Sequence, residues 1–355
     1  MKKKLIWAVA IAAVILIALW AISKNTGNVN GETIKVGAVL PLSGTGSYVG
    51  EEVKKGMQMC NPGNLEFVFE DGAGLSSNSV TAYNKLTQIN KPDVIIVTNS
   101  TVVPAILPIA KANKDFVIAA VVTAADVGKN GGDTVFRYYS DGYKASQVIA
   151  NSMINSGSKN MGILYVQNEF GETYKKGAED FLKGKDISTS LESFQMTETD
   201  FSTSLLKLKQ NNVDSVLIVA YDKQTIQAIN KIKELKLDIK IFTAWMWNDS
   251  DFEKNPITFN GTYTPRSAYL SSLSEKVIDF NNNYKTKFGI TASQFSAIGC
   301  DLAILIGENK IRKPEQLTKI ESFNGINGEI KQAEYGEFDF PLEMIQYKDG
   351  AVNKI

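Results

Sequence analysis

The chain has 355 residues, with 38 basic and 38 acidic side chains, no histidine, two cysteines and 44% apolar residues. This length and apolar content predict a folded protein of about two domains. Because the formal net charge is zero, the electrostatic term that dominates nucleic-acid affinity is missing, and we expect no nucleic-acid partner. Without histidine, Ser-His-Asp and Cys-His pairs and imidazole zinc sites are excluded, and two cysteines cannot form a Cys-rich metal cluster. We therefore expect a protein that is not an enzyme and that needs no cofactor or metal.

The N-terminal segment has the composition of a membrane-crossing helix. Three lysines at positions 2–4 precede an unbroken apolar run at 5–22, which as a helix would span about 27 Å, close to one hydrocarbon thickness. Lysines in front of such a run stay in the cytoplasm, so the rest of the chain is predicted to be extracytoplasmic. We assign residues 1–32 to this segment and its linker. We favour a retained anchor over a cleaved signal peptide, because no small-residue cleavage site stands out near Trp20-Ala21-Ile22.

The two cysteines, Cys60 and Cys300, are far apart in sequence, so their spacing does not show whether they pair. Cys300 lies in an apolar-periodic stretch, where a buried and unreactive thiol is the usual outcome. We favour unpaired thiols and keep a disulfide as the alternative.

The body of the chain alternates short apolar runs with segments of helical periodicity. The predicted strands are residues 34–40, 65–69, 94–97, 116–122, 161–166, 215–219 and 239–242. Three apolar helix faces are predicted, formed by Phe170, Tyr174, Ala178 and Phe181, by Ile226, Ile229 and Leu235, and by Phe295, Ile298, Leu302 and Leu305. This alternation predicts parallel sheets covered by helices on both faces. It restarts near Met161 after the turn-rich stretch 128–133, which indicates two lobes, and the glycine-punctuated tail predicts strands and turns.

A glycine-rich turn follows the first predicted strand, at residues 41–50. Its Gly44-x-Gly46 spacing, with Glu70-Asp71 after the second strand, resembles a dinucleotide fingerprint. Pro41 supplies no N–H group for a phosphate, so a plain structural turn and a turn that contacts a small ligand are the favoured alternatives.

Three other predicted strand ends carry polar or aromatic residues, and ligands of parallel sheets gather at such ends. Asn99-Ser100-Thr101 offers hydroxyl and N–H groups that suit a carboxylate, with an ordinary N-cap as the alternative. Thr123 adds a second hydroxyl if its strand is a neighbour. Trp245-Met246-Trp247 either packs under a loop or walls a pocket by stacking on an apolar ligand.

Three stretches together carry a family resemblance. They are residues 34–44 (IKVGAVLPLSG) running to Gly56-Met57-Gln58, residues 200–221, and residues 323–330 with the closing Lys348-Asp349-Gly350. Over residues 33–355 the chain resembles the solute-binding proteins of branched-chain amino acid ABC importers, which have the type I periplasmic-binding fold. The resemblance implies two doubly wound α/β lobes, 33–140 plus 264–326 and 141–263 plus 327–355, joined by three crossovers. It also implies closure on a small solute that ABC permease subunits then receive.

The resemblance also implies a set of binding residues. Ser100 matches the serine that holds the ligand carboxylate, Val121 matches a residue that offers backbone groups, and Thr123 matches a second hydroxyl. Phe170 and Tyr221 match aromatic residues that cover the ligand from the facing lobe. The full candidate set is Tyr48, Ser100, Thr101, Val121, Thr123, Phe170, Tyr221, Trp245 and Met246.

One departure from the family pattern concerns the ligand itself. The carboxylate that receives the ligand ammonium falls on residues 245–247, with Asp249 and Asp251 displaced. An ammonium without a partner in a closed cleft costs several kcal/mol. The solute is therefore a carboxylate with an apolar or aromatic body, or an amino acid whose ammonium reaches Asp249 or Asp251. We expect a solute-binding protein of an importer; the alternative is a sensing ectodomain that signals through a membrane partner.

Overall fold

The computed structural model describes residues 33–355, apart from positions 45, 125, 246, 248, 268, 270, 271 and 273. The predicted N-terminal anchor lies outside these residues. Among the helices that are described, none combines the length and the apolar character needed to cross a membrane.

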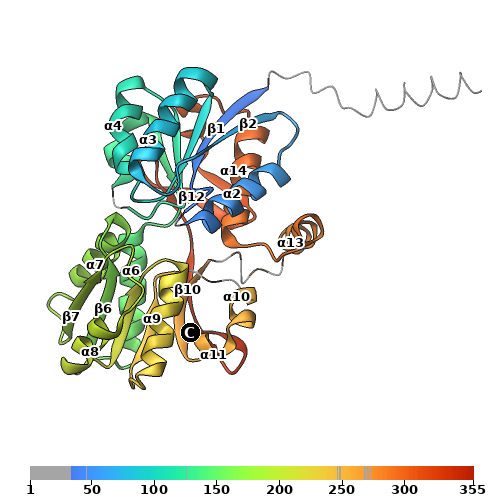
Figure 1. The fold of residues 1–355 in the computed structure, drawn as a ribbon. Coiled ribbons are helices and arrows are strands. Elements are labelled where there is room, and N and C mark those ends of the chain that lie inside the picture. Colours follow the sequence, from blue (N-terminus) through green and yellow to red (C-terminus); the bar gives the residue numbers. More distant parts are fainter. Residues whose placement is uncertain are drawn as a thin grey trace, which may run out of the picture. The chain divides into compact units, whose positions relative to one another are not determined.

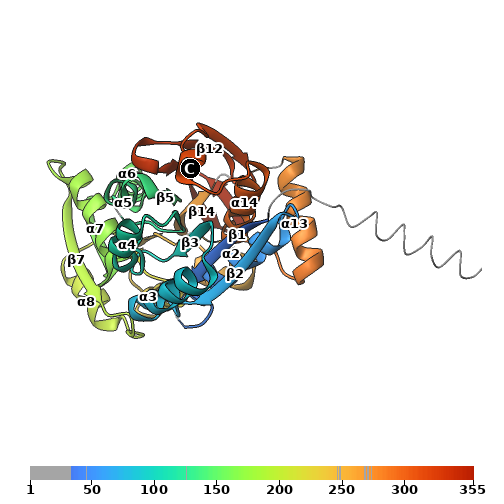
Figure 2. The same ribbon diagram turned by 90° about the horizontal axis from the view of Figure 1, so that it is seen from above.

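The first lobe is built on a five-stranded parallel sheet of order β2-β1-β3-β4-β5 (Figures 1 and 2). Its strands are β1 (Ile34–Leu40), β2 (Leu65–Asp71), β3 (Val94–Thr98), β4 (Val117–Ala120) and β5 (Val135–Tyr138). Side chains alternate between the two faces of each strand. Val36 and Ala38 of β1 pack in one cluster with α2 (Ser47–Met59) and α14 (Gln294–Glu308). Val39 packs in another with α3 (Ser76–Lys85) and α4 (Val103–Asn113), so helices cover both faces.

Helices α2 and α14 approach each other closely through glycines. A Cβ on Gly56 would lie 1.9 Å from the Ser296 carbonyl oxygen, and one on Gly299 would lie 2.1 Å from that of Val53. This approach brings Cys60 and Cys300 to a Cα–Cα distance of 5.0 Å, and they form a disulfide. The expectation of unpaired thiols was therefore wrong. Their sequence separation of 240 residues gives no local signal, because only the tertiary packing of the two helices brings them together.

The second lobe is built on a seven-stranded sheet of order β15-β14-β10-β9-β8-β6-β7. Its strands are β6 (Asn160–Val166), β7 (Ser188–Phe194), β8 (Ser215–Val219), β9 (Lys240–Thr243), β10 (Thr262–Ser267), β14 (Leu342–Lys348) and β15 (Ala351–Lys354). Strands β14 and β15 are antiparallel to their neighbours. The helices of this lobe include α6 (Gly142–Asn155), α7 (Glu169–Leu182), α8 (Ser202–Gln210) and α9 (Asp222–Glu234).

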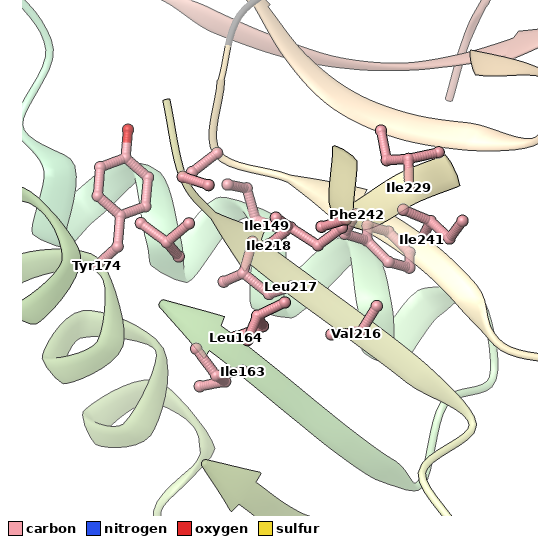
Figure 3. Packing of buried hydrophobic residues seen from close by; sticks show 14 of the residues in the cluster. Ile149, Ile163, Leu164, Tyr174, Val216, Leu217, Ile218, Ile229, Ile241 and Phe242 are labelled. Atoms are coloured by element: carbon pink, nitrogen blue, oxygen red, sulfur yellow. The ribbon is translucent and has the colours of Figure 1, made fainter. Parts of the chain in front are cut away.

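The core of the second lobe forms between its sheet and these helices. Ile163 and Leu164 of β6 lie beside Leu217 and Ile218 of β8, with Ile229 of α9 nearby (Figure 3). The helix face predicted from Phe170 is confirmed at Phe170, Tyr174 and Ala178, which are buried, while Phe181 is half-buried. Tyr174 lies at one end of the side chains drawn in Figure 3.

Three crossovers link the lobes. The first joins β5 to α6, the second joins β10 to α13 (Glu275–Phe288), and the third joins β13 (Phe338–Asp339) to β14. Sheet membership moves two of the predicted lobe boundaries. Strand β10 stays paired with β14 through Ser267, beyond the predicted boundary at 263/264. Ile330 of β12 (Gly328–Gln332) packs in the core of the first lobe, beyond the predicted boundary at 326/327.

The remaining elements are short. They are η1 (Leu86–Asn90), α5 (Val127–Gly131), η2 (Gly132–Thr134), α10 (Asp249–Lys254), α11 (Pro256–Phe259), α15 (Pro314–Leu317), β11 (Ser322–Gly325) and η3 (Glu334–Gly336). Strands β11, β12 and β13 form a three-stranded antiparallel sheet, which confirms that the tail consists mainly of strands and turns.

Candidate functional site

Two neighbouring strands of the first lobe end in the same unusual way. Asn99 directly after β3 has φ 84°, and Val121 directly after β4 has φ 54°. Thr98 and Ala120 are register partners, so the two turns lie at the same edge of the sheet. A β-branched residue at positive φ is strained, and such strain concentrates at functional sites. The backbone therefore turns sharply after both strands.

These turns bring together the two hydroxyls predicted from the sequence. The Ser100 Oγ accepts a hydrogen bond from the Thr123 N–H at 2.9 Å and lies 3.0 Å from the Thr123 Oγ1. Because α4 begins at Val103 with no side-chain cap, Ser100 is not an ordinary N-cap. Each hydroxyl has one proton to donate, and a bond between the two hydroxyls uses only one of them. The pair can therefore still donate a hydrogen bond to a carboxylate oxygen.

The hydroxyl pair lies in the wall of a cavity of about 70 Å³. A cavity needs about 10–15 Å³ for one water molecule, so this one has room for a small solute. The described lining residues are Pro41, Gly46, Val49, Asn99, Ser100, Val121, Thr123, Tyr139, Phe170, Tyr174, Tyr221, Ala244, Trp245 and Phe295. They come from both lobes, and none of these described residues carries a charged side chain.

Aromatic side chains form a continuous wall of this cavity. Ring centroids are 5.2 Å apart for Phe170 and Tyr221, 6.1 Å for Tyr221 and Trp245, and 5.7 Å for Trp245 and Phe295. Since Phe295 belongs to α14 and Trp245 follows β9, the last contact joins the two lobes. Trp247, by contrast, is buried in the core of the second lobe, with its ring centroid 4.7 Å from that of Phe259. Each of the two alternatives for the tryptophans therefore holds for one residue. Trp245 lines the pocket, and Trp247 packs in the core.

The polar groups of the cavity are neutral hydrogen-bonding groups. Burial raises the pKa of the Tyr139, Tyr174 and Tyr221 phenols, so these groups stay protonated and can donate. The Asn168 amide donates to the Tyr221 hydroxyl at 3.3 Å. Phenol and hydroxyl donors in an apolar cavity suit an anionic group. The described lining residues offer no carboxylate to a cation.

A family comparison identifies this arrangement. The model of the periplasmic binding protein family matches residues 33–309. The chain belongs to the periplasmic binding protein family. This confirms the family resemblance inferred from the sequence.

Individual relatives agree with the assignment. Leu/Ile/Val-binding protein homolog 3 of Brucella melitensis is 25% identical over 238 residues, which cover 62% of this chain. The match spans only 61% of that relative.

Solved periplasmic binding proteins share the fold at lower identity. The solute-binding protein of an ABC transporter from R. palustris, in complex with benzoate, superposes with a TM-score of 0.82 and 19% identity, covering 91% of this chain and 95% of that one. The branched-chain amino acid transporter substrate-binding protein of Streptococcus pneumoniae, in complex with isoleucine, gives 0.80 and 19%, covering 91% and 99%. A Rhodopseudomonas palustris protein in complex with 3,4-dihydroxybenzoic acid gives 0.80 and 16%, covering 92% and 96%.

Most of the predicted site residues of this periplasmic binding protein line one cavity. They are Ser100, Val121, Thr123, Phe170, Tyr221 and Trp245. Tyr48 lines an adjoining chamber instead, while Val49 lines both. The Thr101 N–H donates to the Asn99 side chain at 2.9 Å, and Thr101 is not among the described lining residues. Met246 and the side chain of Asp249 lie outside what the structure describes, and Asp251 is not among the described lining residues either.

Three aromatic lining residues were not predicted as part of the site. Tyr139 follows β5, a strand missing from the prediction. Tyr174 and Phe295 were assigned to apolar helix faces, which the structure confirms, but each also reaches the cavity near a helix start. Their position in the first turns of helices at the ligand-binding edge of the sheets is the signal that could have identified them.

Asp71, the last residue of β2, has a structural role. The Asp71 Oδ1 accepts the Leu42 N–H at 2.9 Å and the Ala73 N–H at 2.7 Å, and the Ser43 hydroxyl donates to Oδ2 at 2.6 Å. This carboxylate therefore holds the glycine-rich turn in place. Pro41, Gly46 and Val49 of the same turn line the cavity, so the turn is held by Asp71 and also reaches the candidate site.

Proposed function

We propose that this protein is the extracytoplasmic solute-binding component of an ABC importer and that it captures a small carboxylate-bearing solute between its lobes. The observation that carries the proposal is the Ser100–Thr123 hydroxyl pair inside an aromatic cavity whose described lining has no charged side chain. Relatives with the same fold support it, since the ligands named for them, benzoate and isoleucine, are both carboxylates.

The lining favours an acid with an apolar or aromatic body over an α-amino acid. An α-ammonium group lies next to the carboxylate and needs an anionic partner close to Ser100, and burying it without one costs several kcal/mol. The described cavity residues offer only apolar side chains and neutral polar groups there. An aromatic ring can pack edge-on or in an offset stack against Tyr221, Trp245 and Phe295, which adds about 0.5–1.5 kcal/mol per ring pair.

Closure of the lobes provides the capture step. Trp245 and Phe295 come from different lobes, and their contact exists only when the lobes are close together. A solute that touches both lobes stabilises the closed arrangement over any open one by the contacts that only closure allows. Permease subunits would then distinguish loaded from empty protein by this difference.

Calorimetric titration with benzoate and with isoleucine tests the proposal. We expect benzoate to bind more tightly than isoleucine. Ser100→Ala and Thr123→Val should each weaken benzoate binding about tenfold, the loss expected for a hydrogen bond to a charged group. Ser77→Ala, at an exposed serine of α3, is the matched control. Tighter binding of isoleucine would contradict the choice of solute, and no binding of either compound would contradict the site.

A further inference from the structure

A second chamber of about 400 Å³ adjoins the aromatic cavity. The two spaces share Gly46, Val49, Tyr221 and Trp245 as wall residues. The chamber is completed by the start of α2, including Tyr48, and by Met196, Glu198, Thr199 and the start of α9 from the second lobe. A solute held at Ser100 therefore has this chamber as its next space beyond Tyr221 and Trp245.

The charged groups of the chamber are mainly acidic. Asp222 and Glu198 contribute carboxylates, and Lys223 is the one cationic side chain among its described residues. Asp222 is half-buried and forms no ion pair within the described part of the chain. Burial raises the pKa of the Asp222 carboxyl, and Lys223 opposes the effect. A cation in the chamber would compensate the desolvated carboxylate.

Gln224 fixes the second-lobe wall of the chamber. It is only 7% exposed, and its amide nitrogen donates to the carbonyls of Met196 at 3.0 Å and Glu198 at 3.2 Å. These two bonds tie the segment before α8 to the start of α9, next to Asp222. The Asp222 carboxylate therefore stands on a wall that is held in place by buried hydrogen bonds.

The aromatic residues of the chamber point to the same chemistry. Tyr48, Tyr221 and Trp245 all line it, and the faces of such rings attract cations. The N-terminus of α9 carries a partial positive charge, which favours a nearby anion. Asp222 in the first turn of α9 already supplies that anion, so the helix end does not require an anionic ligand. A half-buried carboxylate and aromatic rings around one chamber together favour a cationic nitrogen.

We propose that the solute carries a protonated amine at the end opposite its carboxylate, with the amine in the second chamber against Asp222. This inference rests on the proposed function, because it takes the carboxylate to lie at Ser100 and Thr123 and the aromatic body to lie between them and the chamber. The ligand class is an aromatic carboxylate with a distal aminoalkyl group, which differs from an α-amino acid in the separation of its two charges.

Two matched pairs of probes test the proposal on the full chain by calorimetry at low salt. They are 4-(aminomethyl)benzoate with its neutral isostere 4-ethylbenzoate, and 4-(2-aminoethyl)benzoate with 4-propylbenzoate. In at least one pair we expect the amine to bind about tenfold more tightly than the isostere. Adding salt should reduce this ratio, because the chamber is partly open to solvent.

Variants separate recognition from folding. Asp222→Asn should bring the ratio close to one while leaving the 4-ethylbenzoate affinity within about twofold of the wild type. Asp238→Asn, an exposed residue of the same lobe outside the chamber, removes the same charge and should preserve the ratio.

The outcomes distinguish the two proposals. Equal or tighter binding of both neutral isosteres overturns the second chamber as an amine site and leaves the proposed function intact. A ratio that survives in Asp222→Asn overturns the assignment to Asp222. If neither the four probes nor benzoate bind, the proposed function and this inference both fall.

Discussion

The guanidinium of Arg137, on β5, forms an ion pair with the carboxylate of Glu337, directly before β13. Arg137 also lies 3.1 Å from the Asp141 carboxylate and donates to the Ala124 carbonyl at 2.5 Å. Glu337 in turn accepts the Gly128 N–H at 2.8 Å. Because Arg137 is only 2% exposed, one buried cation connects the strand that leads into the first crossover with the segment that leads into the third.

Removing this cation should strongly destabilise the protein. Arg137→Met leaves the carboxylates of Asp141 and Glu337 without their partner, and losing one member of a buried ion pair typically costs about 3–5 kcal/mol. Lys144→Met is the control, since it removes an exposed pair with Asp339 at 3.5 Å, for which less than about 1 kcal/mol is expected. Urea unfolding of both variants gives the comparison. Equal, small losses would show that the Arg137 ion pair contributes little to the free energy of unfolding.

The disulfide between Cys60 and Cys300 should stabilise the folded protein, because it restricts the conformations of the unfolded chain. It closes a loop with a sequence separation of 240 residues, and disulfides typically stabilise by about 2–4 kcal/mol. We expect a thiol reductant to lower the free energy of unfolding of the wild type by an amount in this range. The same reductant should leave the double variant Cys60→Ala, Cys300→Ala unchanged. An unchanged wild type after verified reduction would contradict the prediction.

Local sequence pattern identified the strands that are buried and rich in β-branched residues. Strands β5, β7 and β10 were not predicted because each contains residues that blur such a pattern. Strand β5 has only four residues, including Arg137; β7 is a mostly polar edge strand; and β10 contains Pro265 and Arg266. Their pairing is decided by neighbouring strands, which local pattern does not reveal.

The part of the candidate site that depends only on the order of the strands could be predicted from the sequence. Ser100 and Thr123 follow adjacent parallel strands, so their proximity follows from the fold class once β3 and β4 are neighbours. The contribution of Phe295 depends on α14 returning to the first lobe, and the second chamber depends on how residues 196–199 meet α9. Both are tertiary relationships between distant segments.

Tyr139 should support ligand binding without supporting the fold. Its side chain lines the cavity, and burial keeps its hydroxyl protonated by raising its pKa. Tyr139→Phe removes one donor and keeps the ring, so benzoate affinity should fall about three- to tenfold, the value of one hydrogen bond. Thermal unfolding should change little. Tyr83→Phe is a useful contrast, because the Tyr83 hydroxyl donates to Asp115 at 2.7 Å away from the cavity, and it should lower stability without changing affinity. The reverse pattern in Tyr139→Phe would exclude it from the site.

Asp301 should make stability fall as the pH rises. The residue is fully buried on α14, and its carboxylate accepts the Asn327 N–H at 3.1 Å and the Asn327 side-chain amide at 2.9 Å. Burial raises the pKa of Asp301 to about 6, despite these hydrogen bonds. Since this value lies above the pKa in the unfolded chain, the folded protein binds more protons between about pH 4 and pH 6. Stability from this group is fully present below about pH 4, and up to about 3 kcal/mol is lost as the pH rises through 6, from ~1.4 kcal/mol per pKa unit.

Comparing the wild type with Asp301→Asn isolates this contribution, because the other titrating groups cancel in the difference. Urea unfolding from pH 4 to pH 7 should give a difference in the free energy of unfolding, wild type minus variant, that declines with rising pH. Asp200→Asn has the opposite linkage, because hydrogen bonds from Ser202 lower the pKa of Asp200, so its stabilisation is lost only as the pH falls below about 4. Its difference should therefore stay flat over the same range. A flat or rising difference for Asp301→Asn would mean that Asp301 is ionised in the folded protein throughout.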